Sequence, residues 1–307
     1  MNNVERELVR WVCEGDIKRA RMQARIVLSG MKAAKDQRFR DDMLRKLDSK
    51  GPELIELPPN MRGLLVAEDQ ENFPAARFLI RRGERDLVDE LMATVKAAEK
   101  LSQKGIRYLP SALLYGVSGS GKTMLARYIA HKAGKPFVYM QFSNIVSSLL
   151  GSTQSNIGKI FDYARTFPCV LCLDEIDAIG MARGQQQEVG EMDRIVIALM
   201  QELDRMPNDV IVIGTTNRFD RLDAALVRRF TIQHEVLPLN EEEAVQVAER
   251  FFRYSGYRVF WVKEWLKEQL SEKGDPFRQN DATFSAAEVV NLCTKKLVSM
   301  VINGDDG

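Results

Sequence analysis

The stretch GVSGSGKT, residues 116–123, carries glycine, lysine and threonine at the G-x-x-x-x-G-K-[ST] spacing of a phosphate-binding loop. Glycines let backbone amides turn toward phosphate oxygens, and the N-terminus of a following helix adds its positive dipole end. Lys122 would reach the β and γ phosphates, and the Thr123 hydroxyl would bind Mg²⁺. A glycine-rich turn without a nucleotide is the alternative. The residues expected to contact the nucleotide are Gly116, Val117, Ser118, Gly119, Ser120, Gly121, Lys122, Thr123 and Met124.

An acidic pair, Asp174 and Glu175, follows the apolar run CVLCL. A buried strand would deliver both side chains at its carboxyl end, the edge of an α/β sheet where ligands bind. Asp174 suits coordination of Mg²⁺, and Glu175 suits a general base that orients water for attack on the γ phosphate. A protein that only holds a nucleotide needs the first carboxylate but not the second. The pair therefore favours hydrolysis, with a helix N-cap as the alternative.

Polar and basic residues follow the next apolar run, VIVIG. Asn217 would lie at the end of that strand, where it could hydrogen-bond both the γ phosphate and the attacking water. Arg228 and Arg229 come eleven and twelve residues later. Arginines this far from their own loop suit a finger inserted into a neighbouring subunit's site. A pair of surface arginines is the alternative reading, and the spacing alone does not separate the two.

The elements that must position these residues alternate between strands and helices. Short apolar runs at 111–116, 136–142, 169–175 and 210–216 are typical of strands buried on both faces of a parallel sheet. Amphipathic segments between them predict helices, and the alternation predicts an α/β fold with three αβα layers and a parallel sheet.

Helices are expected on both sides of this α/β region. Residues 3–48 are helix-prone and interrupted only by Gly15 and Gly30, which predicts a helical hairpin at the N-terminus. After Pro238 the strands stop, and at least three helices are expected. The predicted organisation is an N-terminal helical segment and linker at 1–75, a large α/β ATPase subdomain at 76–238 and a helical lid at 239–307.

The composition excludes several classes of function. Lys and Arg number 44 against 43 Asp and Glu, so no whole-chain field argues for nucleic acid or an anionic membrane. No run of 18 apolar residues is present, which argues against a membrane span. The N-terminal residues do not resemble a secretory signal, and four scattered cysteines suit a reducing cytoplasm. Cys169 and Cys172 form a C-x-x-C pair but have no partners for a zinc shell, so buried strand residues are expected.

The ordered combination of these motifs resembles the AAA family of ATPases, over about Gly83 to Val298. That resemblance implies ATP and Mg²⁺ as ligands, Asp174 and Glu175 as the metal-binding and catalytic acids, and Asn217 as the sensor asparagine. It also implies a ring, usually a homo-hexamer, in which Arg228 and Arg229 are arginine fingers acting in trans.

Three positions depart from the common family pattern. The segment VRRF, residues 227–230, is compressed and resembles the microtubule-severing and membrane-scission branch, so either arginine could be the finger. FSAAEVVNL offers no second sensor arginine. Leu149, Leu150 and Gly151 stand where polypeptide-threading members carry an aromatic, an apolar residue and glycine. These three are the candidate substrate pore, and core residues of a short helix are the alternative.

Two classes of client remain open. The first hypothesis is a ring motor that remodels, unfolds or disassembles a protein; in size and organisation the chain resembles compact bacterial and phage ATPases that remodel HORMA-type signalling proteins. The alternative is a nucleic-acid-directed ATPase, a loader or translocase, supported by basic residues near the N-terminus. A nucleotide-gated scaffold is a third, non-enzymatic possibility. The basic residues near the N-terminus that would support the nucleic-acid alternative form the cluster Lys18, Arg19, Arg21 and Arg25.

Overall fold

The computed structural model divides the chain into two compact units, Met1–Glu53 and Leu54–Gly307. Each unit is considered by itself. The described residues are 3–13, 17–31, 37, 39–40, 43–44, 55, 57–58, 61, 63–70, 72–142, 153–180, 186–272 and 283–303.

The first unit contains two helices, α1 (Asn3–Cys13) and α2 (Ile17–Gly30), which pack against each other. Leu28 is buried between them, as expected for amphipathic helices in a hairpin. In the basic cluster, Arg25 is exposed, whereas the side chains of Lys18, Arg19 and Arg21 lie outside the described residues.

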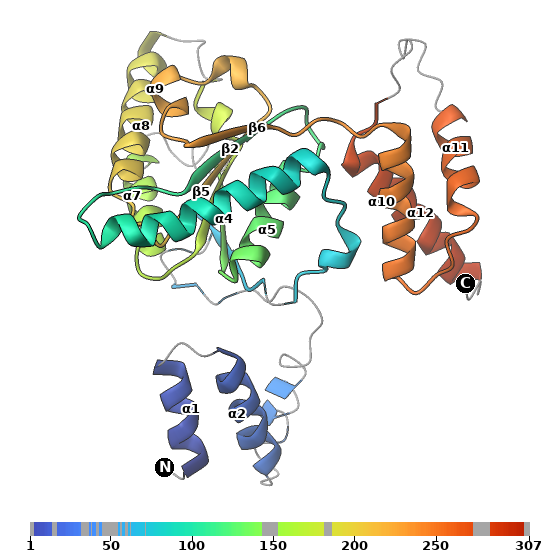
Figure 1. Cartoon of the computed structure of the whole chain (residues 1–307), viewed down its shortest axis with the longest axis horizontal. Helices are drawn as coiled ribbons and strands as arrows, with labels where there is room; N and C mark the ends of the chain where they lie inside the picture. Colours follow the sequence, from blue (N-terminus) through green and yellow to red (C-terminus); the bar gives the residue numbers. More distant parts are fainter. Residues whose placement is uncertain are drawn as a thin grey trace. The chain divides into compact units, whose positions relative to one another are not determined.

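The second unit is built on a six-stranded sheet (Figure 1). The strand order is β1-β3-β4-β5-β2-β6; β1 runs antiparallel to β3, and the other pairs are parallel. From β2 the chain crosses to β3 on one side, and from β5 it crosses back to β6 on the other. A change of direction of this kind opens a crevice at the carboxyl ends of the strands. The strands are β1 (Val66–Glu68), β2 (Ser111–Tyr115), β3 (Phe137–Gln141), β4 (Val170–Asp174), β5 (Ile211–Thr216) and β6 (Ile232–Glu235).

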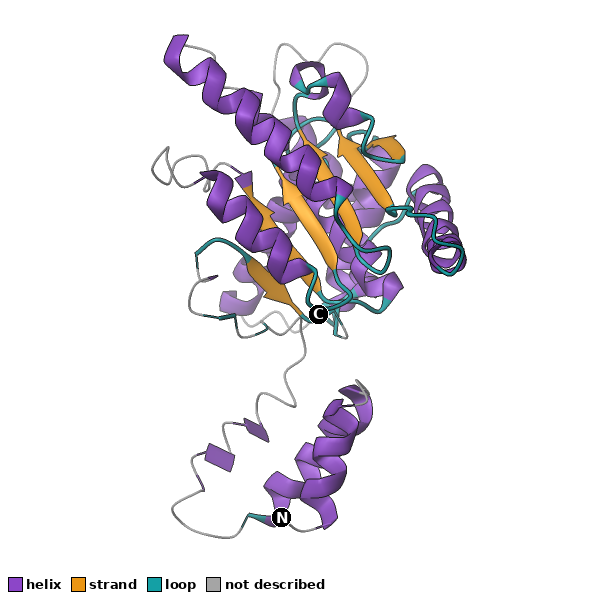
Figure 2. Ribbon diagram, turned by 90° about the vertical axis from the view of Figure 1, so that its left-hand side faces the viewer, coloured by secondary structure: helices purple, strands orange, loops and turns teal. Residues whose placement is uncertain are grey.

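Helices cover both faces of the sheet, which makes the expected three layers (Figure 2). Alternate residues of the central strands point to opposite faces, so that Leu113 and Ala112 of β2 enter different cores. One core contains apolar residues of α4 (Arg82–Ser102) and α5 (Lys122–Ala133). The other contains those of α7 (Thr153–Ala164) and α8 (Gln186–Asp204).

A third core belongs to a helical lid at the C-terminal end of the unit. It contains α10 (Glu241–Tyr254), α11 (Val262–Glu272) and α12 (Ala286–Asn303). Asn240 and Glu243 form a capping box at the start of α10. Phe252, Trp261 and Trp265 meet edge to face inside the lid and give it a core of its own.

The fold class predicted from the sequence is confirmed, with one correction to the sheet. The four apolar runs are β2, β3, β4 and β5, but β1 and β6 were not predicted as strands, and β1 makes the sheet mixed rather than purely parallel. Both are edge strands of three or four residues with partly exposed side chains, so neither forms an apolar run.

The prediction that Cys169 and Cys172 are buried strand residues also agrees with the structure. Cys169 and Cys172 are fully buried, and burial raises the pKa of Cys169 to about 12, so both behave as core residues. Within the described part of the chain, every helix is too short or too polar to cross a membrane.

Candidate nucleotide site

The glycine-rich loop lies between β2 and α5, as the motif requires. Gly116, Gly119 and Gly121 have φ values of 142°, 76° and 106°, a region that side chains rarely adopt. A Cβ on Gly116 would lie 2.4 Å from the Val236 carbonyl oxygen, so this position also needs the missing side chain. Gly121 caps α5 without a side-chain hydrogen bond, which leaves the first amides of the helix able to bind an anion.

Lys122 is folded back onto this loop. Its Nζ donates to the carbonyl oxygens of Gly116, at 3.0 Å, and Val117, at 2.8 Å. Burial lowers the pKa of Lys122, and the carboxylates of Asp174, Asp177 and Glu175 oppose that effect. The lysine is therefore held in the loop by bonds that phosphate oxygens can replace.

Asp174 ends β4 and faces Thr123 at the start of α5. The Thr123 hydroxyl donates to Asp174 Oδ1 at 3.2 Å, and the Thr215 hydroxyl donates to the same oxygen. Tyr139 donates to Oδ2 at 2.7 Å. A hydroxyl beside a carboxylate provides the hard oxygen ligands that Mg²⁺ requires, so Thr123 and Asp174 fit that metal.

Glu175 has a strained backbone. Its φ is 54°, in the left-handed region, and it is the one such residue other than glycine in the described part of the chain. Two hydrogen bonds hold Glu175 in this conformation: the Glu175 backbone amide donates to Thr215 Oγ1 at 3.2 Å, and Gln141 Nε2 donates to Glu175 Oε2 at 2.9 Å. Strain of this kind is common at catalytic sites because it fixes a side chain.

Asn217 follows β5 and is fixed by Asp177. The Asn217 backbone amide donates to Asp177 Oδ1 at 3.3 Å, and the Thr216 hydroxyl donates to the same oxygen at 2.7 Å. Asp177 belongs to the 3₁₀ turn η4 (Ile176–Gly180) that directly follows the acidic pair. The strand end that carries Asn217 is therefore tied to the segment that carries Glu175.

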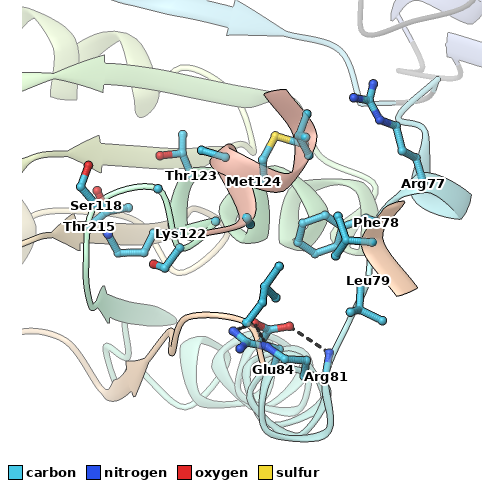
Figure 3. Close-up of a pocket in the computed structure, with 18 of the residues that line it drawn as sticks. Arg77, Phe78, Leu79, Arg81, Glu84, Ser118, Lys122, Thr123, Met124 and Thr215 are labelled. Atoms are coloured by element: carbon cyan, nitrogen blue, oxygen red, sulfur yellow. Dashed lines mark hydrogen bonds and ion pairs between the residues drawn. The ribbon is translucent and has the colours of Figure 1, made fainter. Parts of the chain in front are cut away.

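Residues 118–124, Asp174, Glu175, Thr215 and Asn217 line one cavity of about 490 Å³ between the sheet and the lid, whereas the predicted contacts Gly116 and Val117 are not among its described lining residues. Figure 3 shows Ser118, Lys122 and Thr215 at one end of it and Phe78 and Leu79 at the other. Apolar side chains at the second end suit the flat face of a nucleotide base, and the charged Arg77, Arg81 and Glu84 lie beside them. The apolar residues that line the cavity as a whole include Phe78, Leu79, Met124, Leu239, Val247 and Val290.

The lid closes the cavity with small residues. The Ala287 amide of α12 donates to the Gly119 carbonyl oxygen at 3.0 Å, and a Cβ on Gly119 would come within 3.2 Å of Ala287 Cβ. Among the described lid residues that line the cavity, none is basic.

The two candidate arginine fingers lie away from the cavity. They follow the short helix α9 (Ala224–Val227), and neither lines the pocket of its own chain. The Arg229 guanidinium donates to the Asp204 carboxylate and, from Nη1, to the Ala225 carbonyl oxygen at 3.2 Å. Arg228 is exposed, and its guanidinium has no partner among the residues that the structure describes.

The pore candidates Leu149, Leu150 and Gly151 lie outside the described residues.

Tyr139 and Gln141 hydrogen-bond Asp174 and Glu175, and neither was predicted as a site residue. Both are polar residues, two apart, near the end of an apolar strand, and that alternation could have identified them.

A second group that was not predicted joins the lid to the segment before α4, beside Phe78 and Leu79 in the cavity lining. Arg81 donates to the Glu84 carboxylate and to the Pro238 carbonyl oxygen, and lies 3.7 Å from Glu243 of α10. The Arg77 guanidinium lies 4.4 Å from the centre of the Phe251 ring. No motif marks these contacts, because Arg81 and Pro238 are 157 residues apart in the sequence and the other two pairs are farther apart still.

Comparisons with known proteins match part of this chain to one family of ATPases. Residues 112–237 match the family described as ATPase family associated with various cellular activities (AAA). An uncharacterized AAA family ATPase of Sinorhizobium fredii, y4kL, is 33% identical over 215 residues, which are 69% of this chain and 60% of that protein. The peroxisomal ATPase pex6 of Schizosaccharomyces pombe is 38% identical over 222 residues, which are 70% and 22% of the two chains.

The ATP-dependent zinc metalloprotease FtsH of Parabacteroides distasonis is 31% identical over 227 residues, which cover 71% of this chain and 31% of FtsH. All three alignments span less than two thirds of the relative. Among solved structures, the crystal structure of the FIGL-1 AAA domain superposes with a TM-score of 0.58 at 20% identity, over 82% of this chain and 84% of that one. This last likeness is one of fold.

Proposed function

Residues 112–237 place this chain in the AAA family of ATPases, and on that premise we propose that it is a Mg²⁺-dependent ATP hydrolase. The observation that carries the proposal is the convergence of Lys122, Asp174 and Glu175 on one cavity with an apolar half. The loop amides and the N-terminus of α5 receive the phosphates, and the apolar half receives the base. Lys122 exchanges the two loop carbonyls for phosphate oxygens.

The acidic pair has two separate roles in this proposal. Thr123 and Asp174 hold Mg²⁺, which would neutralise charge on the phosphates. Glu175 orients a water molecule and accepts its proton as the water oxygen attacks the γ phosphorus and the bond to the β-phosphate oxygen breaks. Asn217 hydrogen-bonds the γ phosphate from the end of β5. ADP and phosphate are the products.

We infer that Arg228 completes the site of a neighbouring copy. Its exposure and its lack of a partner among the described residues leave the guanidinium available to another chain, whereas Arg229 is held by Asp204. In enzymes that transfer phosphoryl groups, an arginine that stabilises charge on the transferred group raises the turnover rate by a large factor. This arrangement requires a neighbouring copy of the same chain, and a homo-hexameric ring is the form we propose.

The work done by the ring is proposed to be remodelling of a protein client. The FtsH relative is named as an ATP-dependent protease, which supports a protein as the molecule acted upon. The near-neutral charge of the chain gives no broad field for nucleic acid. HORMA-type signalling proteins are candidate clients on grounds of chain size and organisation, and Leu149, Leu150 and Gly151 remain the proposed pore residues.

One experiment tests the protein-directed role. ATPase turnover of the purified full chain is measured with and without single- and double-stranded DNA, over a range of salt concentrations. We expect no stimulation by DNA. Stimulation that falls steeply with salt would contradict a protein client and favour a loader or translocase.

A pull-down with the Glu175→Gln variant in the presence of ATP then identifies the protein that the ring retains.

A further inference from the structure

Tyr139 contacts the carboxylate proposed to bind the metal. Its hydroxyl donates a hydrogen bond of 2.7 Å to Asp174 Oδ2, while Oδ1 accepts from Thr123 and Thr215. Asp174 is only 8% exposed. Hydroxyl groups therefore bind both oxygens of a nearly buried carboxylate, and the Tyr139 hydroxyl is the donor to the second oxygen.

The tyrosine is itself held in place from two sides. Its ring centre lies 6.2 Å from that of Phe137 and 5.8 Å from the Arg127 guanidinium carbon. Arg127 is fixed in turn by two hydrogen bonds to the Glu68 carboxylate, at 2.9 and 3.1 Å.

We propose that Tyr139 is a positioning residue for the metal: its hydroxyl holds the Asp174 carboxylate in the orientation in which Asp174 and Thr123 bind Mg²⁺. Groups that hydrogen-bond a metal-binding carboxylate fix its orientation, and their loss typically costs about 10- to 100-fold in metal affinity. Without the hydroxyl, the second oxygen loses its donor, and only the bonds to Oδ1 from Thr123 and Thr215 orient the carboxylate. This inference rests on the proposed function, which assigns Mg²⁺ to Thr123 and Asp174.

The test is binding of a fluorescent N-methylanthraniloyl derivative of ATP to the full chain, titrated with Mg²⁺ and repeated in EDTA. Tyr139→Phe keeps the ring and removes the hydroxyl. We expect the Mg²⁺ concentration for half-maximal enhancement of binding to rise about tenfold or more, while affinity in EDTA is unchanged. Tyr163→Phe is the matched control, since the Tyr163 hydroxyl has no hydrogen-bond partner among the described residues.

The outcomes separate this inference from the function it rests on. An unchanged or lower Mg²⁺ requirement in Tyr139→Phe, when the wild type shows Mg²⁺-enhanced binding, overturns the positioning role alone. Equal loss of affinity with Mg²⁺ and in EDTA, or a large fall in the melting temperature, shows a structural role and also overturns it. Wild-type binding that does not respond to Mg²⁺ overturns both the inference and the proposed Mg²⁺-dependent function.

Discussion

The Arg229 guanidinium lies against the Asp204 carboxylate, with Nε and Nη2 each 3.3 Å from its oxygens. Asp204 is the last residue of α8, so this pair ties the segment after α9 to the neighbouring helix. The preceding residue, Arg228, is exposed. Two adjacent arginines that the sequence could not distinguish therefore have different surroundings, and different functions are expected of them.

Arg228→Ala is expected to reduce ATP turnover by a factor of roughly a thousand, because loss of an arginine finger removes charge stabilisation in the transition state. ATP binding should change little. Arg229→Ala removes a partly exposed ion pair, so it should lower the free energy of unfolding by only about 0.2–1 kcal/mol. Steady-state turnover and thermal unfolding of the two variants check both expectations. Full turnover in Arg228→Ala would show that this residue is not the finger.

A mixing experiment tests whether the finger acts between chains. Lys122→Ala chains cannot use their own phosphate site but still carry Arg228, whereas Arg228→Ala chains keep an intact site. Mixed assemblies should recover turnover that neither variant has alone. No recovery, despite assembly shown by sedimentation, would argue against an arginine supplied in trans.

Val247→Trp is expected to weaken ATP binding by about tenfold or more, because the larger side chain would fill the apolar half of the cavity that the base requires. Val247 lines the cavity from α10. Gln246→Trp is the matched control, since it adds the same ring at the adjacent exposed position of the helix. Equilibrium binding of labelled ATP checks the difference. Equal affinities in the two variants would show that the base lies elsewhere.

His234 on β6 gives the structure a predictable response to pH. Burial lowers the pKa of His234 below its usual value of 6.5. The unfolded chain therefore binds the proton first as the pH falls, so the contribution of His234 to stability is present above pH 6.5 and is lost below it. Between pH 7.5 and about pH 5, the melting temperature of the wild type should fall more than that of His234→Gln. A larger fall in the variant would contradict this sign.

The sequence was informative where one motif occupies one short stretch. The loop at 116–123 lies between strand and helix as predicted; Asp174 ends β4, and Glu175 and Asn217 directly follow the strands expected to carry them. Each of these predictions used only local spacing and the rule that the carboxyl ends of parallel strands meet at one edge.

Contacts between distant segments were not predictable in this way. The Arg81 contacts with Pro238 and Glu243 depend on how the lid meets the sheet. The bond from Tyr139 to Asp174 depends on strand order and register, which a single sequence does not specify. The strand β1 was missed because it is three residues long and has one fully buried residue, Ala67.

The central claim is that one cavity hydrolyses ATP with Glu175 as the base that orients water. The most direct measurement compares ATP binding and turnover of the wild type and Glu175→Gln, an isosteric change that removes the base. We predict that the wild type hydrolyses ATP and that the variant binds ATP with similar affinity while its turnover falls about 100-fold or more. Turnover of the variant equal to that of the wild type, or a wild type that binds ATP without hydrolysing it, would contradict the account.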